Sequence, residues 1–253
     1  MCGIIACCSQ EAAARVVVEG LKRMEYRGYD SAGIALIADG QLVVKKDIGN
    51  IHDIEARHKL SSLAGNIAIG RTRWATHGGV TSLNVHPHCD CSGRIAVVHN
   101  GIIENYQELR RQLIERGHRF VSETDTEVIP HLIEEKIKNG TLNLIQGVLA
   151  ITSKLEGSYA FLVISGTDPS NIIGARKGSP LVIGVASHLT FAASDALAFP
   201  DSIDQLIPLG DEEVAVLTEN GVDFFDNVGN RLQKETRKFT MRWGNPEYIS
   251  GDK

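Results

Sequence analysis

The second residue of the chain is a cysteine, and Cys2 is followed directly by Gly3. The initiator methionine is usually removed before a small residue, which would leave Cys2 with both a thiol and a free α-amine. An α-amine has a pKa of about 7.7–8.0 and can accept the proton of a thiol whose pKa is about 8.5. Gly3 would let the backbone approach a substrate closely. The pair predicts a nucleophilic catalyst, although many chains begin with Met-Cys without such activity.

Two further segments place polar groups where apolar runs end. His99-Asn100-Gly101 follows one such run. A strand that ends at Asn-Gly can present a side-chain amide beside a backbone N–H, which suits an oxyanion hole for acyl transfer. Arg73 and Trp74 follow another short strand, where an Arg can hold a carboxylate through two hydrogen bonds while the indole ring covers the site. Taken alone, each segment is also compatible with an ordinary turn or a packed strand terminus.

Asp125 lies in the polar run from Ser122 to Glu127 and could pair with a substrate ammonium group. The alternative is helix capping, because Thr124 and Glu127 have the spacing of a capping box. Both interpretations remain open from the residues alone.

The run from His86 to Cys91 contains several possible metal ligands within six residues. Zinc pairs are usually followed by a second pair about 12–20 residues away. The chain offers no such second cluster, so we expect no metal. The alternative is a zinc or redox site that uses Cys89 and Cys91 with His86 and His88. Cys7 and Cys8 lie in an apolar run and are predicted to be buried packing residues.

The composition narrows the class of protein. The chain has 253 residues, which suits one large or two small domains. Its net charge is −5, whereas a nucleic-acid binder usually carries an excess of positive charge. No apolar run reaches the roughly 18 residues of a membrane span, and no charged leader precedes an apolar segment. The five cysteines do not indicate a disulfide scaffold. We therefore expect a cytoplasmic protein with no nucleic-acid or membrane partner.

The elements that must position these residues alternate between strands and helices. Asp39-Gly40 separates two apolar runs and predicts a hairpin. Strands are predicted over 4–8, 33–38, 41–48, 67–70, 94–99, 159–164, 171–175, 181–185, 189–193, 213–218 and 222–226, and helices over 11–26, 104–116 and 126–138. Hairpin connections favour antiparallel sheets, and two sheets with helices on their outer faces would bury this pattern.

Together, these segments resemble the glutamine amidotransferases that use an N-terminal cysteine nucleophile. The shared motifs, in order, are Cys2-Gly3-Ile4, Tyr26-Arg27-Gly28, Asp30-Ser31-Ala32-Gly33, the Arg73 segment, His99-Asn100-Gly101 and 122–127. The stretches EYRGYDSAG, GRTRWATHG, HPH, VVHNGIIENY and SETDTEVI are similar to the glutaminase domain of the glucosamine-6-phosphate synthases, also called glutamine–fructose-6-phosphate aminotransferases (isomerising). The resemblance covers essentially the whole chain.

The resemblance implies an α+β fold of the N-terminal nucleophile hydrolase type. This is a four-layer αββα sandwich with two mainly antiparallel sheets, here as a single domain over residues 1–253. The resemblance also implies that Cys2 is the nucleophile and its freed amine the base. The side chain of Asn100 and the backbone N–H of Gly101 would form the oxyanion hole.

The resemblance assigns the substrate-binding roles to a second group of residues. Arg73 would hold the α-carboxylate of glutamine and Asp125 its α-ammonium group. Thr76 and His77 would line the same pocket, and Trp74 would cover it.

Three supporting residues complete the prediction. Arg27 and Gly28 would shape the loop over the nucleophile, and His86 is a further candidate for that support. Neither a metal nor an organic cofactor is expected.

The implied reaction converts L-glutamine and water into L-glutamate and ammonia, the ammonia-supplying half of glucosamine 6-phosphate synthesis from fructose 6-phosphate. Members of the family continue into a sugar-phosphate isomerase domain. The last residues, Ser250 to Lys253, resemble the hinge before that domain, so we expect it to be absent here and the full-length enzyme to be homo-oligomeric. If Met1 is retained, the alternative is a catalytically silent glutamine-binding module.

Overall fold

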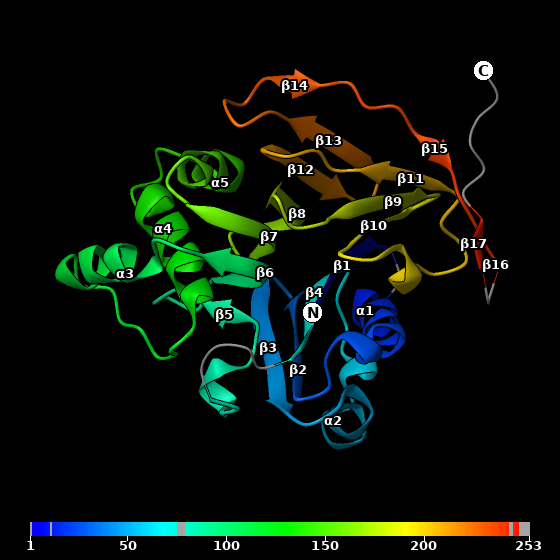
Figure 1. Ribbon diagram of the computed structural model, residues 1–253, viewed down its shortest axis with the longest axis horizontal. Coiled ribbons are helices and arrows are strands. Elements are labelled where there is room, and N and C mark those ends of the chain that lie inside the picture. Colours follow the sequence, from blue (N-terminus) through cyan, green and yellow to red (C-terminus); the bar gives the residue numbers. More distant parts are fainter. Residues whose placement is uncertain (1, 11, 75–78, 243–244, 248–253) are drawn as a thin grey trace.

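Two antiparallel β-sheets form the centre of the molecule, and helices cover their outer faces (Figure 1). The computed structural model describes residues 2–10, 12–74, 79–242 and 245–247. The helices are α1 (Ala13–Arg23), α2 (Ile51–His58), α3 (Tyr106–Glu115), α4 (Val128–Ile137) and α5 (Leu144–Thr152), with 3-10 turns η1 (Glu25–Arg27), η2 (Leu60–Ser62), η3 (Ser82–Asn84), η4 (Asp125–Glu127) and η5 (Ala196–Ala198). The predicted αββα sandwich is confirmed.

The first sheet has the strand order β15-β11-β9-β10-β1-β4-β2-β3. Its strands are β1 (Gly3–Ser9), β2 (Ser31–Ala38), β3 (Gln41–Ile48), β4 (Ile67–Arg73), β9 (Val182–Ala186), β10 (Leu189–Ala193), β11 (Gln205–Pro208) and β15 (Arg237–Lys238). The first strand of the chain, β1, therefore lies in the middle of this sheet, between β10 and β4.

The second sheet has the order β14-β13-β12-β8-β7-β6-β5. Its strands are β5 (His88–Cys89), β6 (Ile95–Ile103), β7 (Gly157–Ser165), β8 (Asp168–Lys177), β12 (Glu213–Thr218), β13 (Gly221–Phe225) and β14 (Arg231–Leu232); β16 (Thr240–Arg242) and β17 (Asn245–Glu247) pair separately. All strand pairs within the two large sheets are antiparallel.

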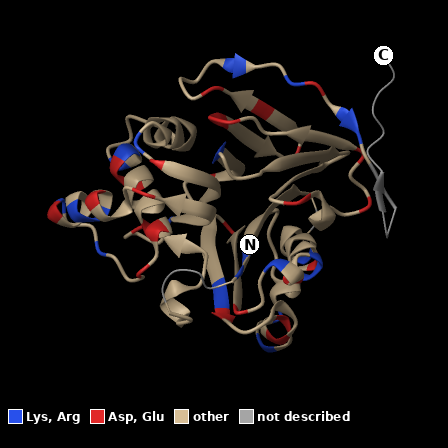
Figure 2. Cartoon of the chain, in the orientation of Figure 1, with Lys and Arg blue, Asp and Glu red and all other residues tan. Residues whose placement is uncertain are grey.

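Buried apolar side chains form three layers. One layer lies between the first sheet and α1 with α2, one between the two sheets, and one between the second sheet and α3, α4 and α5. On α1, Val17 and Leu21 are buried on one face, while Lys22 and Arg23 lie in the last turn, where positive charge suits the helix dipole. The strands of the two sheets carry few charges, whereas the helices and loops carry many (Figure 2).

The expected hairpin forms between β2 and β3, and both turn residues have positive φ, Asp39 at 50° and Gly40 at 73°. Two predictions were wrong. The strand over 94–99 does not end at Asn100 but continues as β6 to Ile103. The predicted helix over 11–26 ends as α1 at Arg23 and is followed by η1.

The capping box considered for Thr124 and Glu127 does not form, and the Thr124 side chain makes no capping hydrogen bond. The carboxylate of Glu127 instead accepts hydrogen bonds from the backbone N–H groups of Val121 and Ser122 over 2.8 and 2.7 Å. A capping box does form at Asn143 and Gln146, at the start of α5.

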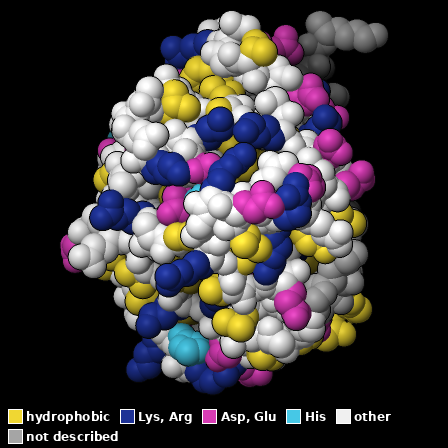
Figure 3. Space-filling view, turned by 90° about the vertical axis from the view of Figure 1, so that its left-hand side faces the viewer, with side chains coloured by type: hydrophobic (Ala, Val, Ile, Leu, Met, Phe, Trp, Pro, Cys, Tyr) yellow, Lys and Arg dark blue, Asp and Glu magenta, His cyan; other side chains and the backbone are white. Residues whose placement is uncertain are grey.

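Charged side chains of both signs are distributed over the surface. On the face at the α3 side of the molecule, Lys and Arg are interspersed with Asp and Glu (Figure 3). Among the described residues, no helix is long and apolar enough to span a membrane.

Candidate active site

Strand alternation explains how two sheets deliver side chains to one place. Successive side chains of a strand point to opposite faces. On β4, Ile67 and Ile69 are buried between the two sheets, so Arg71 and Arg73 continue on the same face. On β6, Val98 belongs to the same layer, and Asn100 follows it at a spacing of two residues.

The thiol of Cys2 lies against the backbone of Trp74. The N–H of Trp74 donates to Sγ over 3.3 Å, and Sγ lies 3.6 Å from the Trp74 carbonyl oxygen. Burial raises the pKa of this thiol, but the positive charge of Arg71 and the Trp74 N–H outweigh it, so the pKa lies below its ordinary value. A lowered pKa increases the thiolate fraction near neutral pH, as a nucleophilic cysteine requires.

Asn100 reaches Cys2 from the other sheet. Its Nδ2 donates to the carbonyl oxygen of Cys2 over 2.9 Å, while Oδ1 is buried without a hydrogen-bond partner. The amide nitrogen carries two hydrogens, so one remains for a second acceptor. The next residue, Gly101, has φ +117°, and a Cβ there would lie 2.0 Å from the carbonyl oxygen of Ser158. Only glycine fits this position without strain.

A cavity of about 120 Å³ lies beside these groups. Its lining residues are Arg71, Arg73, Trp74, His86, His99, Gly101, Ile102, Ile103, Glu104, Tyr106, Glu123, Thr124, Asp125 and Thr126. The structure thus brings together most of the predicted site residues that it describes, from β4, β6 and η4. Thr76 and His77, which we also predicted to line this pocket, lie outside the described residues.

The two predicted charged anchors both line the cavity. Asp125 is oriented by β6, because its Oδ2 accepts the N–H of Ile103 over 2.8 Å. Arg73 is almost fully buried, with Nη1 3.4 Å from the carbonyl oxygen of Gly79. Burial lowers the pKa of Arg73, and the charge of Arg71 lowers it further. A carboxylate in the cavity would therefore find a desolvated guanidinium beside it.

Gly28 packs against the backbone of Arg73 and Trp74, and Arg27 lies beside it in η1. A Cβ at Gly28 would lie 2.5 Å from the carbonyl carbon of Arg73 and 2.7 Å from the nitrogen of Trp74. Arg27 pairs with Asp195, which also accepts the hydroxyl of Tyr26 over 2.7 Å. This packing leaves no room for a side chain at position 28 and fixes the Trp74 backbone that contacts the thiol.

Arg71 lines the cavity beside Cys2 and was missed by our sequence analysis. The buried ring of His86 accepts a hydrogen bond from its guanidinium through Nε2. Burial and the charge of Arg71 hold the pKa of His86 well below its usual value, so the ring is neutral and can accept. His86 thus contacts Arg71, and its support of the loop at Gly28 stays a prediction. The signal in the sequence was the spacing of Arg71 and Arg73, which places both on one face of a strand.

The remaining cysteines differ from Cys2. Cys7 and Cys8 are buried in β1, as predicted, and burial raises the pKa of Cys8 to about 12. Cys89 is partly buried, and burial raises its pKa to about 11. Of these thiols, only Cys2 has its pKa lowered.

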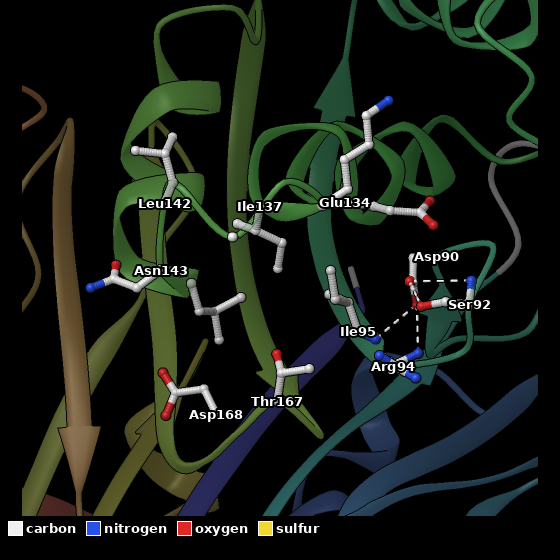
Figure 4. Close-up of a pocket in the computed structure, with 13 residues that line it drawn as sticks. Asp90, Ser92, Arg94, Ile95, Glu134, Ile137, Leu142, Asn143, Thr167 and Asp168 are labelled. Carbon is white, nitrogen blue, oxygen red and sulfur yellow. Dashed lines mark hydrogen bonds between the residues drawn. The ribbon is translucent and has the colours of Figure 1, made fainter.

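A larger hollow of about 540 Å³ lies elsewhere, between the turn at Asp90 to Ile95 and the helices α4 and α5 (Figure 4). It contains none of the predicted site residues. In Figure 4 the carboxylate of Asp90 accepts hydrogen bonds within its own turn, from the N–H groups of Arg94 and Ile95, both over 2.8 Å.

Comparison with known proteins agrees with this geometry. The glutamine amidotransferase domain family matches residues 81–200. The chain is 49% identical over 220 residues to the glutamine–fructose-6-phosphate aminotransferase (isomerizing) of Pyrococcus horikoshii, covering 87% of this chain and 37% of that protein. It is 44% identical over 235 residues to the enzyme of that name from Clostridium acetobutylicum, covering 93% of this chain and 38% of that protein. The chain therefore spans about two fifths of the length of these relatives.

Among solved structures, the chain resembles the glutamine phosphoribosylpyrophosphate amidotransferase of B. subtilis, solved with ADP and GMP. The TM-score is 0.77 at 30% sequence identity, covering 90% of this chain and 50% of that one.

Proposed function

We propose, on the premise that this chain contains a glutamine amidotransferase domain, that it hydrolyses L-glutamine to L-glutamate and ammonia with Cys2 as the nucleophile. One observation carries the proposal. The Cys2 thiol, whose pKa is lowered, is held by the Trp74 backbone and reached by Asn100, beside a cavity with a cationic and an anionic anchor.

In this proposal, Arg73 binds the α-carboxylate of glutamine and Asp125 its α-ammonium group. Arg73 is buried and Asp125 is oriented by the Ile103 N–H, so an amide lacking the amino-acid head would forgo both charged contacts and bind less tightly. The bound substrate then presents its side-chain amide to Cys2.

The α-amine of Cys2 takes the thiol proton, the sulfur attacks the amide carbon, and the carbonyl oxygen becomes an oxyanion. The second hydrogen of Asn100 Nδ2 and the N–H of Gly101 stabilise that charge. The C–N bond breaks, and ammonia leaves with a proton supplied by the α-amine of Cys2. Water then hydrolyses the γ-glutamyl thioester, which releases glutamate and restores the thiol. The amine can serve as base only if Met1 is removed.

We further propose that the ammonia serves the amination of fructose 6-phosphate, the second substrate in the names of the relatives. That step would need a sugar-phosphate isomerase domain in addition to the residues of this chain.

The test is intact mass before and after treatment with 6-diazo-5-oxo-L-norleucine, a glutamine-like alkylator. We expect a chain without Met1 that gains a single adduct on Cys2, and thiol-dependent ammonia release from glutamine. Cys2→Ala should abolish both, whereas Cys89→Ala, at another partly buried thiol, should preserve them. A chain that keeps Met1, binds glutamine and gains no adduct would instead be a silent glutamine-binding module.

A further inference from the structure

A second cluster of reactive side chains lies outside the cavity described above. It consists of Cys91, His118, His131 and Glu134, each of which offers one ligand atom within 4.8 Å of the others. Cys91 belongs to the turn between β5 and β6, and His118 follows α3. His131 and Glu134 are one helical turn apart on α4 and so lie on the same helix face.

The distances within the cluster have a specific pattern. Sγ of Cys91 lies 3.6 Å from Nδ1 of His118 and 3.5 Å from Nδ1 of His131. Oε2 of Glu134 lies 3.0 and 3.4 Å from the same two nitrogens. Around a tetrahedral zinc ion, the usual bond lengths separate a thiolate sulfur from an imidazole nitrogen by about 3.6 Å, and that nitrogen from a carboxylate oxygen by about 3.3 Å. The four distances given above lie within about 0.3 Å of these spacings.

Hydrogen bonds can satisfy only part of this arrangement at any one time. An imidazole Nδ1 carries at most one hydrogen, which points at one acceptor. Here, each of the two Nδ1 atoms lies near both the sulfur and the carboxylate oxygen. A cation at the common point would satisfy all four atoms at once.

Two further carboxylates lie near the far ring nitrogens of the cluster. The far ring nitrogen of His131 lies 3.7 Å from Oε1 of Glu127, and that of His118 lies 3.8 Å from Oε1 of Glu135. These distances are too long for hydrogen bonds, but the two negative charges favour a cation held between the rings. The N–H of Arg119 donates to Sγ of Cys91 over 3.3 Å.

We propose that Cys91, His118, His131 and Glu134 bind one Zn²⁺ ion as a structural site. One thiolate and two imidazoles favour zinc over magnesium or calcium, and four protein ligands would close the coordination sphere. The ligands connect the β5–β6 turn to α4, which directly follows η4 and therefore Asp125 of the cavity. The turn that presents Cys91 is held by the Asp90 hydrogen bonds drawn in Figure 4, where Glu134 also appears.

Metal content tests the proposal. The background is Cys2→Ala, so that zinc cannot bind the catalytic thiol. Reduced protein loaded with zinc and dialysed should retain about one ion per chain by elemental analysis. Cys91→Ser and His131→Gln should each lose most of it, whereas Cys89→Ser, two residues away and outside the cluster, should keep it.

Cobalt substitution provides an independent readout. Co²⁺ should give the absorption bands of a tetrahedral thiolate complex, and the thiolate-to-cobalt band should disappear in Cys91→Ser. Zinc should also raise the Tm of the background protein but not of its Cys91→Ser form. The proposal is overturned if folded, reduced protein retains no zinc and gives no such band, or if metal binding persists unchanged in Cys91→Ser.

Discussion

The side chain of Asn100, in the second sheet, lies 2.9 Å from the backbone carbonyl oxygen of Cys2, which adjoins the first sheet. Asn100 is on β6 of the second sheet, and Cys2 immediately precedes β1 of the first. The proposed nucleophile and its proposed oxyanion donor therefore meet only when the two sheets are packed face to face. Changes at either residue test this arrangement.

Asn100→Ala should lower kcat for glutamine hydrolysis by about 10²–10³, because one oxyanion donor is lost. Steady-state ammonia release measures the effect, and Asn105→Ala, whose amide bonds the carbonyl oxygen of Lys154 instead, is the control. An unchanged kcat with a raised KM would make Asn100 a binding residue rather than an oxyanion donor.

Arg71→Met should raise the pKa of Cys2. Loss of the nearby positive charge makes the thiolate less stable, so alkylation near neutral pH should slow and its pH profile should move upward. The rate of iodoacetamide reaction at Cys2, followed by mass spectrometry across pH, measures the shift. Arg57→Met removes an arginine that pairs with Asp47 on the surface and should leave the profile unchanged. Identical profiles for Arg71→Met and wild type would exclude the electrostatic role.

Asp125→Asn should weaken recognition of the α-ammonium group. A hydrogen bond to a charged group contributes about 1.5–3 kcal/mol, so kcat/KM for glutamine should fall about 10–150-fold. The kcat/KM for glutaramate, which lacks the α-amine, should fall much less. The kcat/KM values of the two substrates should therefore become more similar in Asp125→Asn. Asn retains an acceptor for the Ile103 N–H, which keeps the loop in place. Equal losses for both substrates would point to a structural role.

His99 should make the fold sensitive to acid. Burial lowers its pKa to about 4, so the native ring stays neutral while an unfolded histidine takes up a proton below about pH 6.5. The free energy of unfolding should therefore fall as pH falls from about 6.5 to about 4, by about 3 kcal/mol from this residue. Urea unfolding across pH measures it.

His99→Gln should flatten that dependence, whereas His52→Gln, at an exposed histidine, should not. Parallel pH curves for His99→Gln and wild type would contradict the assignment. His86 and His88 also have lowered pKa values, so some acid sensitivity should remain in His99→Gln.

The sequence predicted the parts of the fold that depend on local pattern. Apolar runs located β1, and Asp39-Gly40 located the hairpin, because turn chemistry of this kind is set within a few residues. Asn100-Gly101 has a similar local signal but does not end its strand. Pairing of Gly101 with Tyr159 on β7 continues the ladder, and glycine tolerates the φ of +117° within it.

Two helices were missed for different reasons. In α5, Gly147 and several β-branched residues lower helix propensity, and only the capping box at Asn143 marked its start. In α2, eight residues rich in polar side chains bury only Ile51 and Ile54, which is a weak periodic signal.

The same distinction between local sequence signals and tertiary contacts applies to the candidate site. Cys2, Arg73, Asn100 and Asp125 could be chosen because their motifs are local. Arg71 and the cluster at Cys91 depend on tertiary contacts, since His118 and His131 lie 27 and 40 residues from Cys91 in sequence. No spacing rule for adjacent ligands could have joined them.

The central place of β1 has a consequence for synthesis. Ile5 pairs with Ala193, so the strand next to the nucleophile lacks one neighbour until nearly 190 further residues have been made. At translation rates of about 5–20 residues per second, this takes about 10–40 s. During that time the N-terminal segment is not yet enclosed between its two partner strands, and a ribosome-associated aminopeptidase can reach it. If methionine is removed during this interval, its removal precedes completion of the sheet.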